Sequence, residues 1–177
     1  MTRILGAILS GGASSRFGGD KLMADVAGMP LIEHVTAQLS PQVAMVVLLG
    51  RGYGGLAYLP DRPAPNLGPL GGLNSALHFA IEHEFDAVLM VPGDTVNLPM
   101  DLTDALGEGP AYVSDSPVTG IWPANLAPKL ELWLAEGRTR SVAAFGDHID
   151  ARAVTLDKPV VNINTRRDYE IYLADEL

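Results

Sequence analysis

A glycine-rich run between Ser10 and Lys21 holds the residues whose types and spacing best suit a chemical role. It follows an apolar stretch, 4–9, that predicts a buried strand. Small residues leave backbone N–H groups uncovered, and successive uncovered N–H groups form a concavity that suits an anion. Arg16 and Lys21 add fixed positive charge, so the sequence predicts a phosphate-binding loop at the carboxyl end of the first strand. The alternative is an ordinary solvated pair of charges.

Two common glycine motifs do not describe this loop. A P-loop needs Gly-x4-Gly-Lys-Ser/Thr, whereas the spacing from Gly12 to Gly18 is one residue too long and no Lys-Ser follows. The Gly-x-Gly-x-x-Gly pattern of dinucleotide-binding proteins occurs once, at 50–55. The run that follows it ends at Pro60 and cannot open the required helix, so we interpret 50–55 as a flexible loop.

Asp94 is the strongest candidate for a metal ligand. It follows the apolar run 87–91, which predicts a second buried strand. Mg²⁺ prefers oxygen ligands and often takes only one or two carboxylates, with phosphates and water completing its shell. We expect no dedicated two-metal cage, because the sequence shows no second carboxylate in a comparable context. The alternative is that Asp94 caps a helix or a turn.

Asp61 could recognise a nucleotide base. It lies in a Pro- and Gly-rich loop, 60–72, that we expect to overhang the site. A carboxylate there could accept from N1–H and N2–H of guanine, the edge that distinguishes guanine from adenine; alternatively, Asp61 is a turn residue. Gly71 and Gly72 lie directly before a predicted amphipathic helix, 73–83. Their lack of a side chain would allow either close packing of the backbone or the approach of a nucleotide to the helix N-terminus.

Four further polar residues are candidates for binding a second substrate. Asn162 and Asn164 are two apart in a short extended run, so their side chains face the same way. Arg138 and Arg140 could bind a phosphate of that substrate or could belong to a solvated helix start. The four histidines are scattered, and no Ser-His-Asp arrangement can be argued from their spacing.

Apolar runs alternate with helical patterns along the chain, and this order predicts an α/β fold with a mostly parallel sheet flanked by helices. The predicted strands are 4–9, 43–49, 87–91, 111–114, 118–122 and 153–156. The predicted helices are 30–39, 73–83, 125–134 and 167–174. We expect one domain, 1–177, with ligands bound beyond the carboxyl ends of the strands, where the glycine loop and Asp94 both fall.

Composition narrows the classes of partner. The net charge of −9, from 12 basic and 21 acidic residues, disfavours nucleic acid and anionic membrane, so we expect neither as a partner. A polyanionic substrate therefore needs a locally positive site. The absence of cysteine excludes disulfides and thiolate metal sites, and no apolar run has membrane-spanning length. We expect a cytoplasmic protein that is a monomer or a small homo-oligomer.

Four motifs occur in an order that resembles nucleotidyltransferases, and most closely the molybdenum cofactor guanylyltransferase (MobA) family. The resemblance covers nearly the whole chain and implies a Rossmann-like nucleotidyltransferase fold. The motifs are Leu9-Ser-Gly-Gly…Ser15-Arg-Phe-Gly-Gly-Asp-Lys21, Gly68-Pro-Leu-Gly-Gly-Leu73, Val91-Pro-Gly-Asp-Thr95 and Asn162-Ile-Asn-Thr165. Four positions depart from the family pattern: Gly50 where the family has Asn, Gly93 where it usually has Cys or a similar small residue, Ser116 where it has His, and Arg166 where it has Pro.

The resemblance implies a Mg²⁺-dependent transfer of GMP from GTP to the terminal phosphate of molybdopterin, releasing pyrophosphate. It also makes transient contacts with proteins that deliver or receive the cofactor plausible. By this resemblance Arg16, Lys21 and Asp94 would act in catalysis, and Asn162 and Asn164 would lie toward the pterin. The implied GTP-binding set is Leu9, Ser10, Gly11, Gly12, Lys21, Asp61, Gly68, Gly71 and Asp94. Two alternatives stay open: a related enzyme using CTP or a sugar or polyol phosphate, and a non-catalytic cofactor-delivery protein that binds nucleotides.

Overall fold

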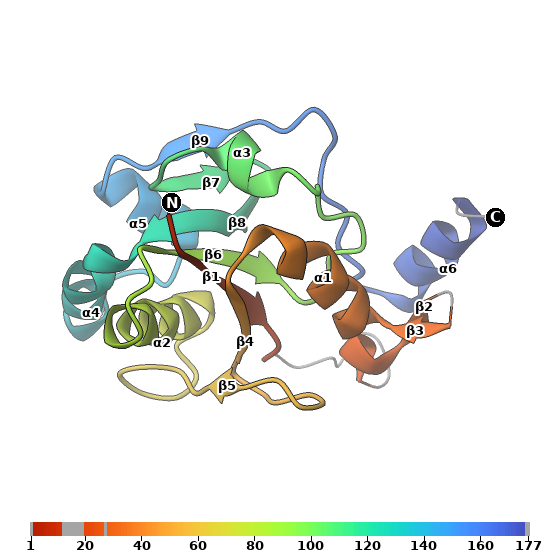
Figure 1. Ribbon diagram of the computed structural model, residues 1–177, viewed down its shortest axis with the longest axis horizontal. Helices are drawn as coiled ribbons and strands as arrows, with labels where there is room; N and C mark the ends of the chain where they lie inside the picture. Colours follow the sequence, from red (N-terminus) through yellow and green to blue (C-terminus); the bar gives the residue numbers. More distant parts are fainter. Residues whose placement is uncertain (1, 12–19, 27, 176–177) are drawn as a thin grey trace.

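Seven strands form one sheet with helices on both of its faces (Figure 1). The computed structural model describes residues 2–11, 20–26 and 28–175. In spatial order the strands are Tyr58–Leu59 (β5), Met45–Leu49 (β4), Ile4–Leu9 (β1), Ala87–Pro92 (β6), Ser116–Pro123 (β8), Ala111–Val113 (β7) and Arg152–Val154 (β9). Within this described sheet only β8 pairs antiparallel to its neighbours, so the predicted α/β fold with a mostly parallel sheet is confirmed.

Each face of the sheet is covered by its own helices and its own apolar cluster. One face carries Pro69–Glu82 (α2), Ala127–Ala135 (α4) and Val142–His148 (α5). The other carries Leu31–Leu39 (α1) and Leu102–Leu106 (α3). Away from the sheet, Arg166–Asp175 (α6) lies near the small hairpin Asp25–Val26 (β2) and Met29–Pro30 (β3). Three 3₁₀ turns complete the described elements: Lys21–Met23 (η1), Ser40–Gln42 (η2) and Ala124–Leu126 (η3).

Helix α2 begins four residues earlier than its apolar period predicts. Pro69 occupies the first helical position, where its missing N–H costs no hydrogen bond, and Gly68 enters the helix with φ +68°. The prediction that 60–72 is entirely loop is therefore wrong for 69–72. Leu70, Leu73 and Leu77 are fully buried against the sheet, and burying a side chain of this size contributes about 1.5–3 kcal/mol.

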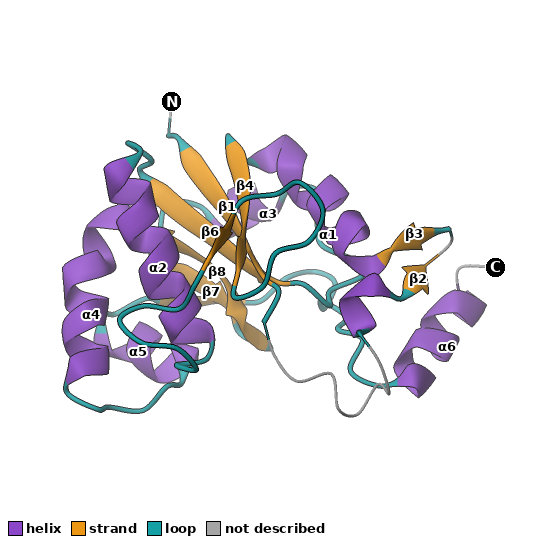
Figure 2. Cartoon of the chain, turned by 90° about the horizontal axis from the view of Figure 1, so that it is seen from below, coloured by secondary structure: helices purple, strands orange, loops and turns teal. Residues whose placement is uncertain are grey.

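The register of the parallel strands brings three chain segments to one edge of the sheet. Leu9 at the end of β1 pairs with Leu49 of β4 on one side and with Pro92 of β6 on the other. The residues that follow these strands are therefore neighbours in space, at the edge where the strand arrowheads end in Figure 2. Among the residues that the structure describes, no helix combines the length and the apolar character needed to cross a membrane.

Candidate functional site

Two hollows flank the carboxyl end of β1 and share a wall made by Leu9, Ser10, Gly11 and Arg51. The first has a volume of about 400 Å³, and we call it the Asp94 pocket. Besides the shared wall it is lined by Asp20, Lys21, Leu22, Tyr53, Pro92, Gly93, Asp94, Asp115, Ser116, Pro117, Val118 and Asn162. The second, of about 580 Å³, is the Asp61 pocket. Its other lining residues are Leu49, Gly50, Pro60, Asp61, Pro65, Asn66, Gly68 and Pro69.

Lys21 and Asp94 meet in the Asp94 pocket. Lys21 begins η1, a turn capped by Asp20, whose carboxylate accepts from the Leu22 amide at 3.3 Å. The Lys21 Nζ lies 2.5 Å from Asp94 Oδ2, and the two side chains are 22% and 15% exposed. Asp94 stands where it does because the amide of Gly93 donates to the Leu9 carbonyl at 3.0 Å. A Cβ at position 93 would lie 2.6 Å from that carbonyl oxygen, which gives the departure at Gly93 a structural reason.

The two asparagines of the last motif lie in different surroundings. Asn162 lines the Asp94 pocket, where its Oδ1 accepts from the buried hydroxyl of Thr95 at 2.7 Å. Asn164 is exposed at the start of α6, its backbone N–H donates to Asp168 at 3.0 Å, and it lines neither pocket. The two residues therefore do not act as one pair facing the site, because the chain leaves its extended course to begin a helix.

The loop before α2 forms the far wall of the Asp61 pocket. Asp61 Oδ2 accepts from the amide of Leu67 at 3.1 Å, which fixes the carboxylate within the loop. Gly71 is buried and does not line the pocket. A Cβ there would lie 2.7 Å from the Leu67 Cβ and 3.1 Å from the Asp61 Cβ. Gly71 thus allows close packing of α2 against this loop, while Gly68 lines the pocket itself.

Neither Arg138 nor Arg140 reaches the Asp94 pocket. The Arg138 Nε pairs with Glu136 at 2.6 Å, and its guanidinium lies 4.9 Å from the centroid of the Trp133 ring. Arg140 donates to the carbonyl of Asn66, a residue that lines the Asp61 pocket, at 2.8 Å. Neither arginine therefore lies with Asn162, and Arg140 contacts the wall of the other pocket.

The glycine-rich loop is described only at its ends. The N–H groups of Ser10 and Gly11 both donate to the Leu49 carbonyl, at 2.9 and 3.1 Å. They are therefore not among the uncovered donors that the sequence predicts for an anion. Gly12 and Arg16 lie outside the described residues.

The sequence analysis did not assign a functional role to four charged or aromatic residues that line the Asp94 pocket: Asp20, Arg51, Tyr53 and Asp115. Arg51 and Tyr53 follow β4 within the segment 50–55. A charged and an aromatic side chain directly after a buried strand could have indicated a role in binding, because ligands bind at this edge of the sheet. No local pattern marks Asp115, which lies at the turn between β7 and β8.

The carboxylate of Asp94 is the donor in this pocket that suits a hard divalent cation. No group of three or more His, Asp or Glu residues that could hold a metal occurs in the described ranges. A single carboxylate nevertheless fits an ion such as Mg²⁺, which takes one or two carboxylates and completes its shell with phosphates and water.

The departure from the family at Gly50 also has a local reason. Gly50 has φ +103°, and a Cβ there would lie 3.0 Å from the Gly11 Cα and 3.1 Å from its N. A side chain at this position would therefore strain the backbone and force apart the loops after β4 and β1. The shared wall of the two pockets depends on this close approach.

Comparisons with known proteins show the family of the chain. Residues 6–154 match the family model of the MobA-like NTP transferase domain. The molybdenum cofactor guanylyltransferase of Cereibacter sphaeroides is 34% identical over 180 aligned residues, covering 94% of this chain and 93% of its own. That of Rhodobacter capsulatus is 33% identical over 177 aligned residues, with the same coverage.

The fold is likewise that of a solved structure, the molybdopterin-guanine dinucleotide biosynthesis protein A from Archaeoglobus fulgidus. Its TM-score is 0.73 at 19% identity, over 98% of this chain and 100% of that one. The family match spans most of the chain, and the two relatives extend the likeness almost from end to end. The chain therefore belongs to the MobA-like NTP transferase domain family.

Proposed function

We propose that this protein transfers GMP from GTP to the terminal phosphate of molybdopterin, forming the guanine dinucleotide cofactor and pyrophosphate. The observation that carries the proposal is the pair of pockets joined at the end of β1. One contains a carboxylate suited to guanine, and the other contains Lys21 and Asp94. Relatives named molybdenum cofactor guanylyltransferase support the choice of donor and acceptor.

The Asp61 pocket would bind the base. The Leu67 amide holds Asp61 Oδ2, and each carboxylate oxygen can accept more than one hydrogen bond. Both oxygens therefore remain able to accept from N1–H and N2–H of guanine. Cytosine would instead present its carbonyl oxygen to the carboxylate, which is unfavourable. This difference is the reason for proposing GTP over CTP as the donor.

The Asp94 pocket would hold the reacting phosphates. An oxygen of the acceptor phosphate attacks the α-phosphorus of the nucleotide, the bond to the β-phosphate oxygen breaks, and pyrophosphate leaves. Lys21 would bind the phosphate oxygens on which negative charge increases, because preorganised cations stabilise such transition states. A phosphate nucleophile is already anionic at neutral pH, so no general base is needed. Asn162, which lines the same pocket, would contact the acceptor.

Asp94 would hold Mg²⁺, with phosphate oxygens and water as the other ligands of the ion. When bound, the ion would neutralise charge on the phosphates and orient them. Before the substrates bind, Lys21 forms an ion pair with the Asp94 carboxylate. The lysine would therefore exchange that carboxylate for phosphate oxygens when the site fills.

Calorimetric binding of GTP, CTP and ATP with Mg²⁺ tests the proposal, followed by pyrophosphate release with molybdopterin as the acceptor. We expect a preference for GTP that depends on magnesium and is lost in Asp94→Ala. Asp157→Ala is the matched control, because it removes the same charge from an exposed position outside both pockets. A preference for CTP would move the donor assignment to cytidylyl transfer. Tight GTP binding without pyrophosphate release would favour a delivery protein.

A further inference from the structure

Arg51 lies in the wall between the two pockets, so a nucleotide that spans both pockets has to pass it. Of the cations in the described part of the chain, Lys21 and Arg51 line the Asp94 pocket, and Arg51 alone also lines the Asp61 pocket. A nucleotide with its base against Asp61 and its phosphates beside Lys21 must cross the wall between them. The phosphate chain would therefore pass the Arg51 side chain.

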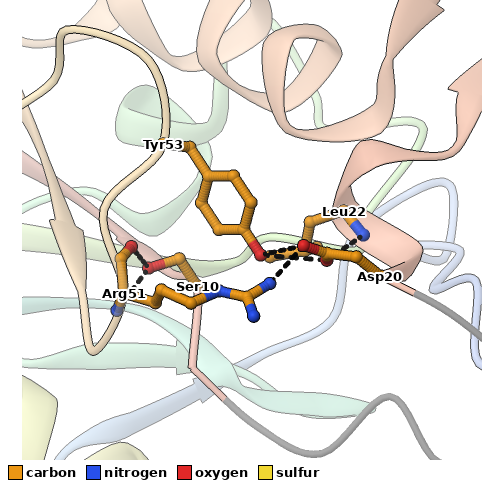
Figure 3. Close-up of polar contacts among 5 residues, drawn as sticks. All are labelled: Ser10, Asp20, Leu22, Arg51 and Tyr53. Atoms are coloured by element: carbon orange, nitrogen blue, oxygen red, sulfur yellow. Dashed lines mark hydrogen bonds and ion pairs between the residues drawn. The ribbon is translucent and has the colours of Figure 1, made fainter.

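The backbone of Arg51 is held firmly in that wall. The Ser10 hydroxyl donates to the Arg51 carbonyl at 2.5 Å and lies 3.2 Å from the Arg51 amide, which donates to it. The preceding glycine packs against Gly11, as its positive φ and close contacts show. The two hydrogen bonds between Ser10 and the Arg51 backbone, visible in Figure 3, fix where the arginine side chain starts.

The charged end is held by two residues of the Asp94 pocket (Figure 3). The Arg51 guanidinium forms an ion pair with Asp20 and lies 4.7 Å from the centroid of the Tyr53 ring. The Tyr53 hydroxyl lies 2.9 Å from each Asp20 carboxylate oxygen. The arginine side chain is 56% exposed and that of Asp20 33% exposed, so water reaches the pair. An exposed ion pair is weak, and a phosphate can displace its carboxylate.

Both cations of the described lining are already paired with a carboxylate, Lys21 with Asp94 and Arg51 with Asp20. A triphosphate can therefore bind either cation directly only by replacing its carboxylate partner. The face of the Tyr53 ring would keep the guanidinium in place while its anionic partner changes.

We infer that Arg51 binds the phosphate chain of the nucleotide where the chain passes between the pockets, and that Asp20 and Tyr53 hold the guanidinium there beforehand. The inference rests on the proposed function and adds a phosphate-binding residue to it. The planar guanidinium can give two parallel hydrogen bonds to a phosphate, which a lysine cannot.

The test measures binding of GTP, GDP and guanosine by calorimetry to wild type and Arg51→Gln. We expect GTP affinity to fall about 10- to 100-fold, the loss expected for a charged hydrogen bond, with a smaller loss for GDP and none for guanosine. Lys129→Gln is the control. It makes the same change of net charge at an exposed site of α4 and should leave all three affinities unchanged.

Equal weakening of GTP and guanosine would overturn the inference, because it would make Arg51 only a structural part of the wall. Unchanged GTP affinity would overturn it as well. If the glutamine variant does not fold, Arg51→Lys replaces it. The lysine variant should lower the affinity for GTP by a smaller factor and leave the affinity for guanosine unchanged. An equal loss of both affinities would contradict the inference. If wild type binds no nucleoside triphosphate at all, the proposed function fails instead.

Discussion

Lys21 and Asp94 are 73 positions apart in the chain, yet their charged groups lie 2.5 Å from each other at the floor of one pocket. The parallel register of β1 and β6 sets Leu9 beside Pro92, and Lys21, at the start of η1, reaches Asp94 at this edge of the sheet. The pair is partly exposed, so its net contribution to folding is small, about 0–1 kcal/mol after screening by water. Its position suits an exchangeable contact better than a structural one.

Replacing Lys21 with Ala should therefore slow turnover far more than it destabilises the fold. We expect kcat to fall about 100- to 1,000-fold, the typical loss on removing one preorganised group that stabilises transition-state charge. The midpoint of thermal unfolding should move by only a few degrees. Pyrophosphate release and a melting curve measure the two quantities, with Lys129→Ala as the control. Wild-type turnover in Lys21→Ala would remove this lysine from the chemistry.

Asp61→Asn should relax the choice of base without disturbing the loop. The asparagine keeps an oxygen that can accept from the Leu67 amide, but its NH₂ group cannot accept from N2–H of guanine. We expect the ratio of kcat/KM for GTP over inosine triphosphate, which lacks the N2 amine, to fall about tenfold or more, the loss expected for one charged hydrogen bond. A ratio equal to that of wild type would place the base elsewhere.

Much of the architecture could be predicted because the strands that form it are locally apolar. Ile4–Leu9 has the predicted bounds, and the alternation of elements was enough to predict a mostly parallel sheet with its site at the carboxyl edge. Helix boundaries were less accurate. Helix α2 begins at Pro69 because a Pro-Leu-Gly-Gly run can form a first turn once Leu70 is buried against the sheet. Helix α5 was not predicted at all.

The site was predictable where a motif lies directly at a strand end and not where it depends on tertiary pairing. Asp94 lies just after β6, where the sequence predicts it, and Lys21, which begins η1, lies against it. The contact of Arg51 with Asp20 joins loops 31 positions apart, and no periodicity encodes it. Their two-residue spacing predicted that Asn162 and Asn164 face the same way. Helix α6 begins shortly after them, and only Asn162 lines the pocket.

Thr95 should position Asn162 for the acceptor. Its buried hydroxyl donates to Asn162 Oδ1, which leaves the amide NH₂ of Asn162 as the donor facing a phosphate or carbonyl oxygen. We expect Thr95→Val to raise the KM for molybdopterin several-fold, as the loss of a neutral hydrogen bond would, with little change in GTP binding. Thr95→Ser should restore the KM. If the serine variant is as impaired as valine, packing of the methyl group accounts for the effect.

The close approach of Gly93 to β1 predicts a large effect of one methyl group on stability. A Cβ at 93 would lie 2.6 Å from a backbone oxygen, and backbone cannot move aside as a flexible side chain can. We expect Gly93→Ala to cost about 1–3 kcal/mol, as overpacking does, and to lower the melting temperature by several degrees. Gly55→Ala is the control, because a Cβ there meets nothing within 4 Å. Equal melting temperatures for both variants would contradict this packing.

The N-terminus of α6 predicts a dependence on pH that a single substitution removes. Asp168 Oδ2 accepts from the amides of Thr165 and Asn164, at 2.8 and 3.0 Å, while its own amide donates to the Thr165 hydroxyl at 3.1 Å. This reciprocal arrangement resembles a capping box. The hydrogen bond from the Thr165 amide, followed by that from Asn164, lowers the pKa of Asp168 below its ordinary value of 3.8.

Because the pKa is lower in the folded chain, the carboxylate stabilises the helix start at pH values above the unfolded value. That contribution is lost as the pH falls through the folded value. The amide resonances of Asn164 and Thr165 should therefore titrate with a midpoint below 3.8, and α6 should fray from its first turn under the same conditions. Asp168→Asn should abolish the titration, while Asp157→Asn should leave it in place. A midpoint at or above 3.8 would show that the two amides do not hold the carboxylate.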